Sequence, residues 1–263
     1  MIFGTGFDCA PVLSERAYSE ATFHGDPRLT DPNVIAGYPD ALTEIWPDTW
    51  PFAPDFRQLL GMLAFGHCSH TLDVGTGSCW TTRMLAEQGG HVVAMDVVET
   101  PFNGLRAGDI QMHAHRVYFD RVLESMTNMP FKDDSFDHVV FNASFHHSPD
   151  EGKTLAEVYR VLKRDGVAAL LSEIAAPIAP LRKRIAGHDR AGAEEGSSHH
   201  DVPYRKFSRL ARKLGFHMRL FLPEHLRIAL RKRLPLGGLP AGVLGHSQSL
   251  LRLVCTSFIL LRK

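Results

Sequence analysis

Two glycines and an aspartate between residues 71 and 96 have the types and spacing of a nucleoside-binding site. The segment TLDVGTGSCW is typical of an apolar strand that runs into a turn at Gly75 and Gly77. Glycines let backbone amides approach a ligand closely, and the start of the following helix favours negative charge. Asp96 ends the next apolar run, VVAMD, where a carboxylate can accept both hydroxyls of a ribose.

A dinucleotide is disfavoured at this turn. The fingerprint G-x-G-x-x-G would place its third glycine at Trp80, where a bulky ring prevents close packing of the helix on the strand. A nucleoside without a pyrophosphate needs only Gly75 and Gly77, and the small Cys79 can line the start of the helix. The alternative is that the glycines form a tight turn and Asp96 caps a strand, with no ligand.

Two histidines and a glutamate follow later apolar runs, where they can handle a proton. His146 and His147 directly follow the strand expected over FDHVVFNASF, and Glu173 follows the apolar run of the strand expected over GVAALLSEI. Parallel α/β sheets bind ligands at the carboxyl ends of their strands, and histidine titrates near neutral pH. His146 is the preferred candidate base. His147 is better explained as a ring that anchors the loop, and Glu173 can orient a substrate or act as a base.

A metal ion is not predicted. His199, His200 and Asp201, together with His146 and Glu173, could in principle supply nitrogen and oxygen ligands. Adjacent histidines, however, usually point apart and lie at the surface. The four cysteines contain no C-x-x-C pair, which argues against a zinc ribbon and gives no disulfide framework.

The elements that must position these residues alternate between strand and helix. A strand over TLDVG precedes a helix over TTRMLAEQG and a strand over HVVAMDV; a strand over FDHVVFNASF precedes a helix over 151–166 and a strand over GVAALLSEI. This order predicts an α/β fold with a doubly wound, mostly parallel sheet. Further on we expect a basic helix over YRKFSRLARKLGF closed by Gly215, a strand over FHMRLFLP, a basic helix from Pro223, and a long strand or hairpin arm over 249–263.

The N-terminal part has turn signals every few residues and is expected to form a cap. We divide the chain into a cap or lid at 1–54 and a main domain at 55–263, with a variable insertion on the substrate side at 176–246. A helix is expected over Asp55–Phe65, with Asp55 as its N-cap. Aromatic side chains of this region can exclude water and stack on an apolar or sugar-like substrate, or form a small satellite core: Trp46, Trp50, Phe52 and Phe56.

The zero net charge conceals an asymmetry between the two parts of the chain. Residues 1–175 hold 12 Lys/Arg against 24 Asp/Glu, and residues 176–263 hold 17 against 5. The parts can attract each other, or the basic part can face an anionic substrate or a membrane surface. The basic helices are also candidates for contact with a lipid-linked substrate. Nucleic acid is not predicted, because the aromatic residues that could stack on bases are concentrated in the acidic part. No membrane span or secretory signal is readable, so the cytoplasm is the expected location.

Four motifs in order resemble the class I S-adenosylmethionine-dependent methyltransferases, especially the small-molecule branch of ubiquinone and menaquinone enzymes. They are LDVGTGSCW, the acidic end of VVAMD, NMPFKDDSFDHVVFNASFHHSPD and LAEVYRVLKRDGVAALL, over about residues 70 to 175. The resemblance implies a seven-stranded, mostly parallel Rossmann-like sheet with an N-terminal cap and a C-terminal insertion.

The resemblance also implies S-adenosyl-L-methionine as the cofactor and assigns residues to it. The methionine part would contact Asp73, Gly75 and Gly77, the ribose Asp96, and the adenine Ser125 and Met126; Asn142 and Ala143 would border the methionine side. The family commonly has aspartate where Ser125 stands. Cys79 replaces a usual glycine, and the turn is expected to survive because the helix has already begun there.

The implied function is methyl transfer to a small molecule, preferably to an oxygen of a sugar, polyketide or quinone-like metabolite. The alternative is a non-catalytic or repurposed cofactor-binding protein that acts as a partner in a biosynthetic complex, and an NAD-linked oxidoreductase is the third hypothesis. The sequence does not identify the oligomeric state.

Overall fold

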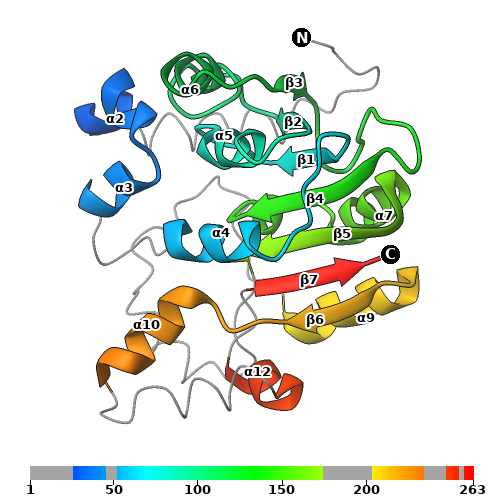
Figure 1. Cartoon of the computed structure of the whole chain (residues 1–263). Helices are drawn as coiled ribbons and strands as arrows, with labels where there is room; N and C mark the ends of the chain where they lie inside the picture. The colour runs from blue at the N-terminus through cyan, green and yellow to red at the C-terminus, as the bar shows by residue number, and fades with distance from the viewer. Residues whose placement is uncertain (1–25, 46–51, 174–202, 234–246, 255–257) are drawn as a thin grey trace.

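A seven-stranded sheet forms the centre of the protein (Figure 1). The computed structural model describes residues 26–45, 52–173, 203–233, 247–254 and 258–263. The strands are β1 His70–Val74, β2 His91–Asp96, β3 Asp120–Leu123, β4 Phe136–Asn142, β5 Leu162–Leu171, β6 His217–Leu220 and β7 Phe258–Arg262. Their order in the sheet is β3-β2-β1-β4-β5-β7-β6, parallel from β3 to β5, with β7 antiparallel to both of its neighbours. The predicted mostly parallel α/β fold is confirmed.

Helices cover both faces of the sheet, which explains why its central strands are apolar on both sides. One core contains buried residues of α7 and α9, and the other contains those of α4 and α5 together with the N-terminal segment. The helices are η1 Pro27–Thr30, α2 Pro32–Ala36, α3 Asp40–Ile45, α4 Phe52–Leu60, α5 Trp80–Ala86, α6 Ala107–His115, η2 Phe145–His147, α7 Glu151–Val161, α9 Tyr204–Leu214, α10 Glu224–Arg233 and α12 Gln248–Val254. None of these described helices is long and apolar enough to cross a membrane.

The helix predicted over Asp55–Phe65 is displaced toward the N-terminus. It begins at Phe52 and ends at Leu60, so Asp55 lies in its first turn and is not the N-cap. The buried Asp55 carboxylate instead accepts the backbone N–H of His225 at 2.9 Å and pairs with its ring nitrogen at 2.5 Å. A long-range contact to α10 therefore determines the role of this acid.

Two predicted boundaries near the C-terminal half are also wrong. The helix expected over 151–166 ends at Val161, because Leu162 adopts extended backbone and pairs with Phe136 at the start of β5. The strand expected over 249–263 is a helix, α12, followed by the shorter β7. The helix over YRKFSRLARKLGF is confirmed, and Gly215 ends it with a φ of 101°.

The described part of the N-terminal cap packs directly on the sheet's helices. The Arg83 guanidinium of α5 donates to the Tyr38 carbonyl at 2.6 Å, and the Gln111 amide of α6 donates to the Ile35 carbonyl at 2.6 Å. Leu29 and Ile35 are fully buried in the same core as α4 and α5. Residues 26–45 thus extend one hydrophobic core, and the division into a cap and a main domain stays a prediction.

Candidate functional site

The glycine turn after β1 adopts a conformation that favours glycine at both predicted positions. Gly75 has a φ of 68° and Gly77 a φ of 49°. A Cβ on Gly75 would lie 2.5 Å from the Cβ of Ser144, and one on Gly77 would lie 2.9 Å from Oδ1 of Asn103. The space left by each missing side chain is therefore filled from a neighbouring loop: the turn after β4 at Gly75, and the segment after β2 at Gly77.

An alanine at position 75 is expected to destabilise the protein. Left-handed backbone and the close approach to Ser144 should together lower the free energy of unfolding by at least about 2 kcal/mol. Denaturant unfolding of Gly75→Ala measures this loss. The matched control is Gly61→Ala, because a Cβ there makes only ordinary contact, 3.6 Å from the Gln58 carbonyl oxygen. Equal stability of the two variants would contradict the packing described here.

The start of α5 differs from its prediction. The helix begins at Trp80, and Cys79 precedes it as the N-cap with a φ of 58°, so the turn does not survive through an early start of the helix. Cys79 itself adopts left-handed backbone at the end of the turn, although it is not a glycine. Burial raises the pKa of the Cys79 thiol to about 12, which keeps it protonated. The Trp80 ring packs edge-on against Phe56 of α4 at a centroid distance of 5.1 Å.

Asp96 organises the turn that faces it. One carboxylate oxygen accepts the backbone N–H of Gly77 at 3.0 Å, and the other accepts that of Val98 at 2.9 Å. The carboxylate thus links the end of β2 to the glycine turn after β1. Binding of a ribose by this carboxylate stays a prediction.

Asp73 lies deeper, below the turn. It is 1% exposed, and one carboxylate oxygen accepts the hydroxyls of Thr81 at 2.7 Å and Thr82 at 2.6 Å. Burial raises the pKa of this carboxyl to about 6, although both hydroxyls act in the opposite direction. The carboxylate therefore anchors α5 to β1, and contact with a cofactor stays a prediction.

This raised pKa predicts a pH-dependent stability. Between about pH 4 and pH 6 the folded protein holds a proton on Asp73 that the unfolded chain has lost, so the Asp73 contribution to stability falls as pH rises through this window. Relative to the parent, Asp73→Asn is expected to gain about 2 kcal/mol between pH 4 and pH 6.5. Denaturant unfolding at pH 4 and pH 6.5 measures the difference. A difference that stays constant with pH would contradict it.

The segment after β3 contains an acid that the sequence analysis missed. Glu124 is 1% exposed; Oε1 accepts the backbone N–H of Ser125 at 2.8 Å, and Oε2 is buried with no hydrogen-bond partner among the described residues. The Ser125 hydroxyl is engaged with the Thr127 hydroxyl at 2.9 Å. Glu124 directly precedes Ser125, the position where the family commonly has an aspartate. An acid one residue away from that position was the sequence feature that could have identified Glu124.

The carboxyl ends of β4 and β5 hold strained backbone beside a buried polar atom. Ala143 follows β4 with a φ of 53°, and Ser172 follows β5 with a φ of 59°. Such conformations are uncommon outside glycine and cluster at functional sites. The side-chain oxygen of Asn142 is buried and has no hydrogen-bond partner in the described part of the chain. A polar ligand group at this edge would satisfy it.

The buried Glu173 and the partly exposed His146 form a hydrogen-bonded pair at the same edge. Glu173 Oε1 accepts the backbone N–H of Ser144 at 2.5 Å, and Oε2 accepts the backbone N–H of His146 at 3.1 Å. Oε2 also lies 2.8 Å from Nδ1 of the His146 ring. The His146 side chain is 17% exposed and that of Glu173 is 1% exposed. Glu173 is therefore placed to orient His146 and the turn, which favours this role over that of a base.

Aromatic packing fixes the short helix that carries the two histidines. Phe145 is fully buried and makes edge-on contacts with Phe141 of β4 and Phe207 of α9. The His147 ring lies 4.4 Å from that of His146, and the Ser144 hydroxyl donates to the Val74 carbonyl at 2.6 Å. That last bond joins the histidine turn to the end of β1, so the glycine turn and the His146–Glu173 pair belong to one site.

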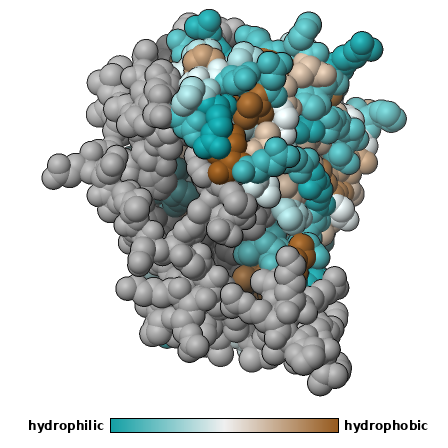
Figure 2. All heavy atoms as spheres, turned by 90° about the vertical axis from the view of Figure 1, so that its left-hand side faces the viewer, coloured by the Kyte–Doolittle hydropathy of each residue, from teal (hydrophilic) through white to brown (hydrophobic). Residues whose placement is uncertain are grey.

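Several predicted residues lie outside this description. Trp46, Trp50, His199, His200 and Asp201 fall outside the described residues, and of Phe52 only the backbone, at the start of α4, is described. Phe56 is fully buried, which favours its interpretation as a core residue. Within the described segments no cluster of three or more metal-ligating side chains is present. Figure 2 views the side toward which β1 and β4 point, where described apolar atoms reach the surface among hydrophilic ones.

Comparison with known proteins finds similarity to methyltransferases. The family model described as "Methyltransferase domain" matches residues 72–170. The demethylmenaquinone methyltransferase of Lactiplantibacillus plantarum is 31% identical over 135 residues, which cover 49% of this chain and 55% of the relative. The arsenite methyltransferase of Aquipseudomonas alcaligenes is 32% identical over 104 residues, covering 36% and 30%. The chain thus spans about half or less of the length of these curated relatives.

Solved structures share the fold. The YcgJ protein of Bacillus subtilis superposes with a TM-score of 0.57 at 17% identity, covering 80% of this chain and 97% of that one. The 1,6-didemethyltoxoflavin-N1-methyltransferase of Burkholderia thailandensis gives a TM-score of 0.54 at 20% identity, covering 84% of each chain. At these identities the similarity establishes a common architecture.

Proposed function

We propose that the protein binds S-adenosylmethionine and methylates a small molecule. The proposal takes residues 72–170, which match the methyltransferase family model, as a class I S-adenosylmethionine-dependent methyltransferase domain. The observation that carries the proposal is the convergence of the glycine turn, Asp96 and the His146–Glu173 pair at one edge of the sheet. Ligands of open α/β sheets bind at this edge.

The residues present fit the cofactor. Asp96 would hold the ribose beside the glycine turn, and Asn142, with its buried acceptor oxygen, would face the amino-acid part. Glu124 has an acceptor oxygen without a partner in the described chain, whereas the Ser125 hydroxyl is already bonded to Thr127. We therefore assign the adenine amine to Glu124, with Ser125 and Met126 beside the ring. Bound there, S-adenosylmethionine supplies a methyl group on a sulfonium, whose departure needs no protonation.

The chain's own contribution to the reaction is alignment and the removal of one proton. A proton on Nδ1 of His146, donated to Glu173, makes Nε2 the basic nitrogen of the ring. Nε2 would then accept the proton of a hydroxyl acceptor as the methyl group is transferred. Glu173 fixes the tautomer and stabilises the imidazolium that forms, as a buried carboxylate does for the histidine of a catalytic triad.

The acceptor we favour is a quinone-like or phenolic metabolite, ahead of a sugar. Support comes from relatives that are named demethylmenaquinone methyltransferases and from the apolar atoms on the side of the molecule where the site lies (Figure 2). An ionisable hydroxyl on an apolar ring would suit a histidine base in such surroundings.

Methyl transfer from isotope-labelled S-adenosylmethionine to a panel of acceptors tests this function. The panel contains hydroquinones, phenolic polyketides and sugars, and mass spectrometry identifies the methylated product and its position. We expect a hydroquinone or phenol to be labelled. Cofactor binding without transfer to any acceptor would instead favour a non-catalytic cofactor-binding protein.

Peripheral contact with an anionic membrane is a further expectation. The outer face of α9 carries only basic charges, all exposed: Arg205, Lys206, Arg209, Arg212 and Lys213. Lys206 pairs with Glu151, and no acidic residue stands within α9. We expect stronger sedimentation with anionic than with neutral vesicles at low salt. Equal binding to both vesicle types would remove the hypothesis.

A further inference from the structure

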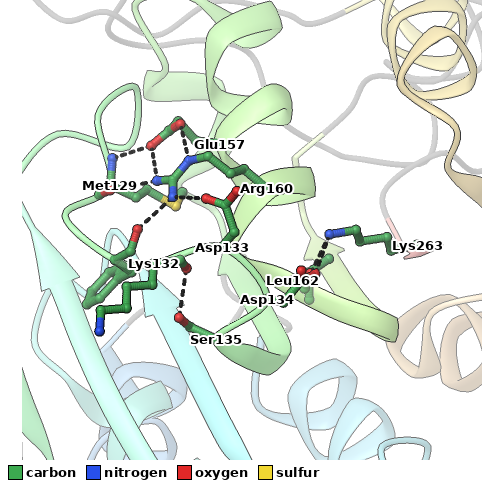
Figure 3. A network of polar contacts seen from close by, with 10 residues as sticks. Met129, Lys132, Asp133, Asp134, Ser135, Glu157, Arg160, Leu162 and Lys263 are labelled. Atoms are coloured by element: carbon green, nitrogen blue, oxygen red, sulfur yellow. Dashed lines mark hydrogen bonds and ion pairs between the residues drawn. The ribbon is translucent and has the colours of Figure 1, made fainter.

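Arg160 and Glu157 of α7 fasten the loop between β3 and β4 (Figure 3). The guanidinium donates to the carbonyls of Phe131 at 2.6 Å and Met129 at 2.9 Å and to the Asp133 carboxylate at 2.9 Å. Its remaining N–H groups donate to both oxygens of Glu157 at 2.8 Å. All five donors of the arginine fork are thus used.

Glu157 completes the attachment by binding the same residue of the loop. Its Oε2 accepts the backbone N–H of Met129 at 2.7 Å, so both backbone polar groups of Met129 are held by α7. The hydrogen bond from Arg160 holds the pKa of the Glu157 carboxyl below its usual range, and Glu157 raises that of Arg160. Each group therefore favours the charged form of the other.

The fastened residue is one end of the turn that the proposed function puts against the adenine. At the other end, the backbone N–H of Glu124 donates to the Asp96 carbonyl at 3.1 Å. The turn between these ends is closed by the Asn128 N–H donating to the Ser125 carbonyl at 3.0 Å. One end of the turn is thus attached to β2 and the other to α7, and the Arg160–Glu157 pair fixes the α7 end.

We propose that Arg160, fixed by Glu157, is a positioning residue that determines the affinity and the base selectivity of the cofactor site without touching the cofactor. This inference rests on the proposed function. Lysine cannot replace arginine here, since one ammonium has three donors and no planar fork to span two carbonyls and a carboxylate.

Calorimetric titration of S-adenosylhomocysteine, and of the same molecule with hypoxanthine in place of adenine, tests the inference. The parent is expected to prefer adenine. In Arg160→Lys and Arg160→Gln we expect the affinity for S-adenosylhomocysteine to fall roughly tenfold or more. We also expect the ratio of the affinities for the adenine and the hypoxanthine ligand to fall toward one. The matched control is Lys263→Gln. Lys263 binds the same loop farther on, at the Asp134 carboxylate, and also the Leu162 carbonyl at the start of β5, both at 2.7 Å (Figure 3).

The ratio of the two affinities separates positioning from a purely structural role. A variant that is merely less stable would lower its melting temperature and leave the ratio as in the parent, and that result overturns the inference. Arg160→Lys keeps the positive charge beside Glu157 and serves where Arg160→Gln does not fold. If the parent itself binds no S-adenosylhomocysteine, the proposed function fails first; if the parent binds it and the ratio is unchanged in both variants, only this inference fails.

Discussion

Replacing Asp96 with alanine is expected to weaken binding of S-adenosylhomocysteine about 100-fold. The variant would lack the carboxylate that is proposed to bind the ribose hydroxyls. The backbone N–H groups of Gly77 and Val98, which lie 3.0 Å and 2.9 Å from the carboxylate oxygens, would lose their acceptor. Charge-assisted hydrogen bonds of this kind are worth about 1.5 to 3 kcal/mol each. Calorimetric titration of the parent and the variant measures the change.

The control for the Asp96→Ala variant is a substitution of Asp120, an acid of the neighbouring strand β3 that does not contact the glycine turn. Asp120 begins β3, is exposed, and accepts a hydrogen bond from the Tyr118 hydroxyl at 2.9 Å. We expect Asp120→Ala to bind S-adenosylhomocysteine as the parent does. Comparable affinities of Asp96→Ala and the parent would remove the ribose assignment.

Replacing His146 with asparagine is expected to lower the rate of methyl transfer to a hydroxyl acceptor by roughly 100- to 10,000-fold. The variant would lose the group that accepts the proton, whereas the cofactor residues would remain. Single-turnover kinetics with saturating S-adenosylmethionine and the acceptor identified by the panel measures the loss. The affinity for S-adenosylhomocysteine should stay within a factor of about three.

His147 provides the matched comparison for His146. Its ring lies 4.4 Å from the His146 ring on the same short helix, so His147→Asn removes a neighbouring imidazole from the same turn. We expect His147→Asn to retain most of the rate. Equal losses of rate in the two variants would show that His146 is not the base. The same would follow if the rate of His146→Asn had the same pH dependence at high pH as the rate of the parent.

The fold was predictable because many residues favour it together. The apolar runs at β1, β2, β4 and β5 and the intervening helix patterns specify a doubly wound sheet, and single boundary errors do not change that order. The boundaries depend on tertiary contacts. Leu162 leaves the helix because it pairs with Phe136, and Asp55 lies inside α4 because its partner is His225, distant in the sequence.

The local geometry of the candidate site was predictable where it depends on a residue's own position in a motif, whereas the binding roles of these residues stay predictions. Gly75 and Gly77 have the left-handed backbone expected of a glycine turn, and Asp96 faces that turn. Other roles arise only from contacts across the fold: Glu173 holds the turn of His146, and Arg160 holds the loop that follows β3. Hydrogen bonds between distant segments leave no periodic pattern in the sequence.

Titration of the parent protein with S-adenosylhomocysteine and, separately, with NADH tests the central claim most directly, namely that the turn at Gly75 and Gly77 accepts a nucleoside cofactor and refuses a dinucleotide. The account predicts saturable binding of S-adenosylhomocysteine with one molecule per chain and no heat of binding from NADH. Binding of NADH, or the absence of any binding of S-adenosylhomocysteine by the folded parent, would contradict it.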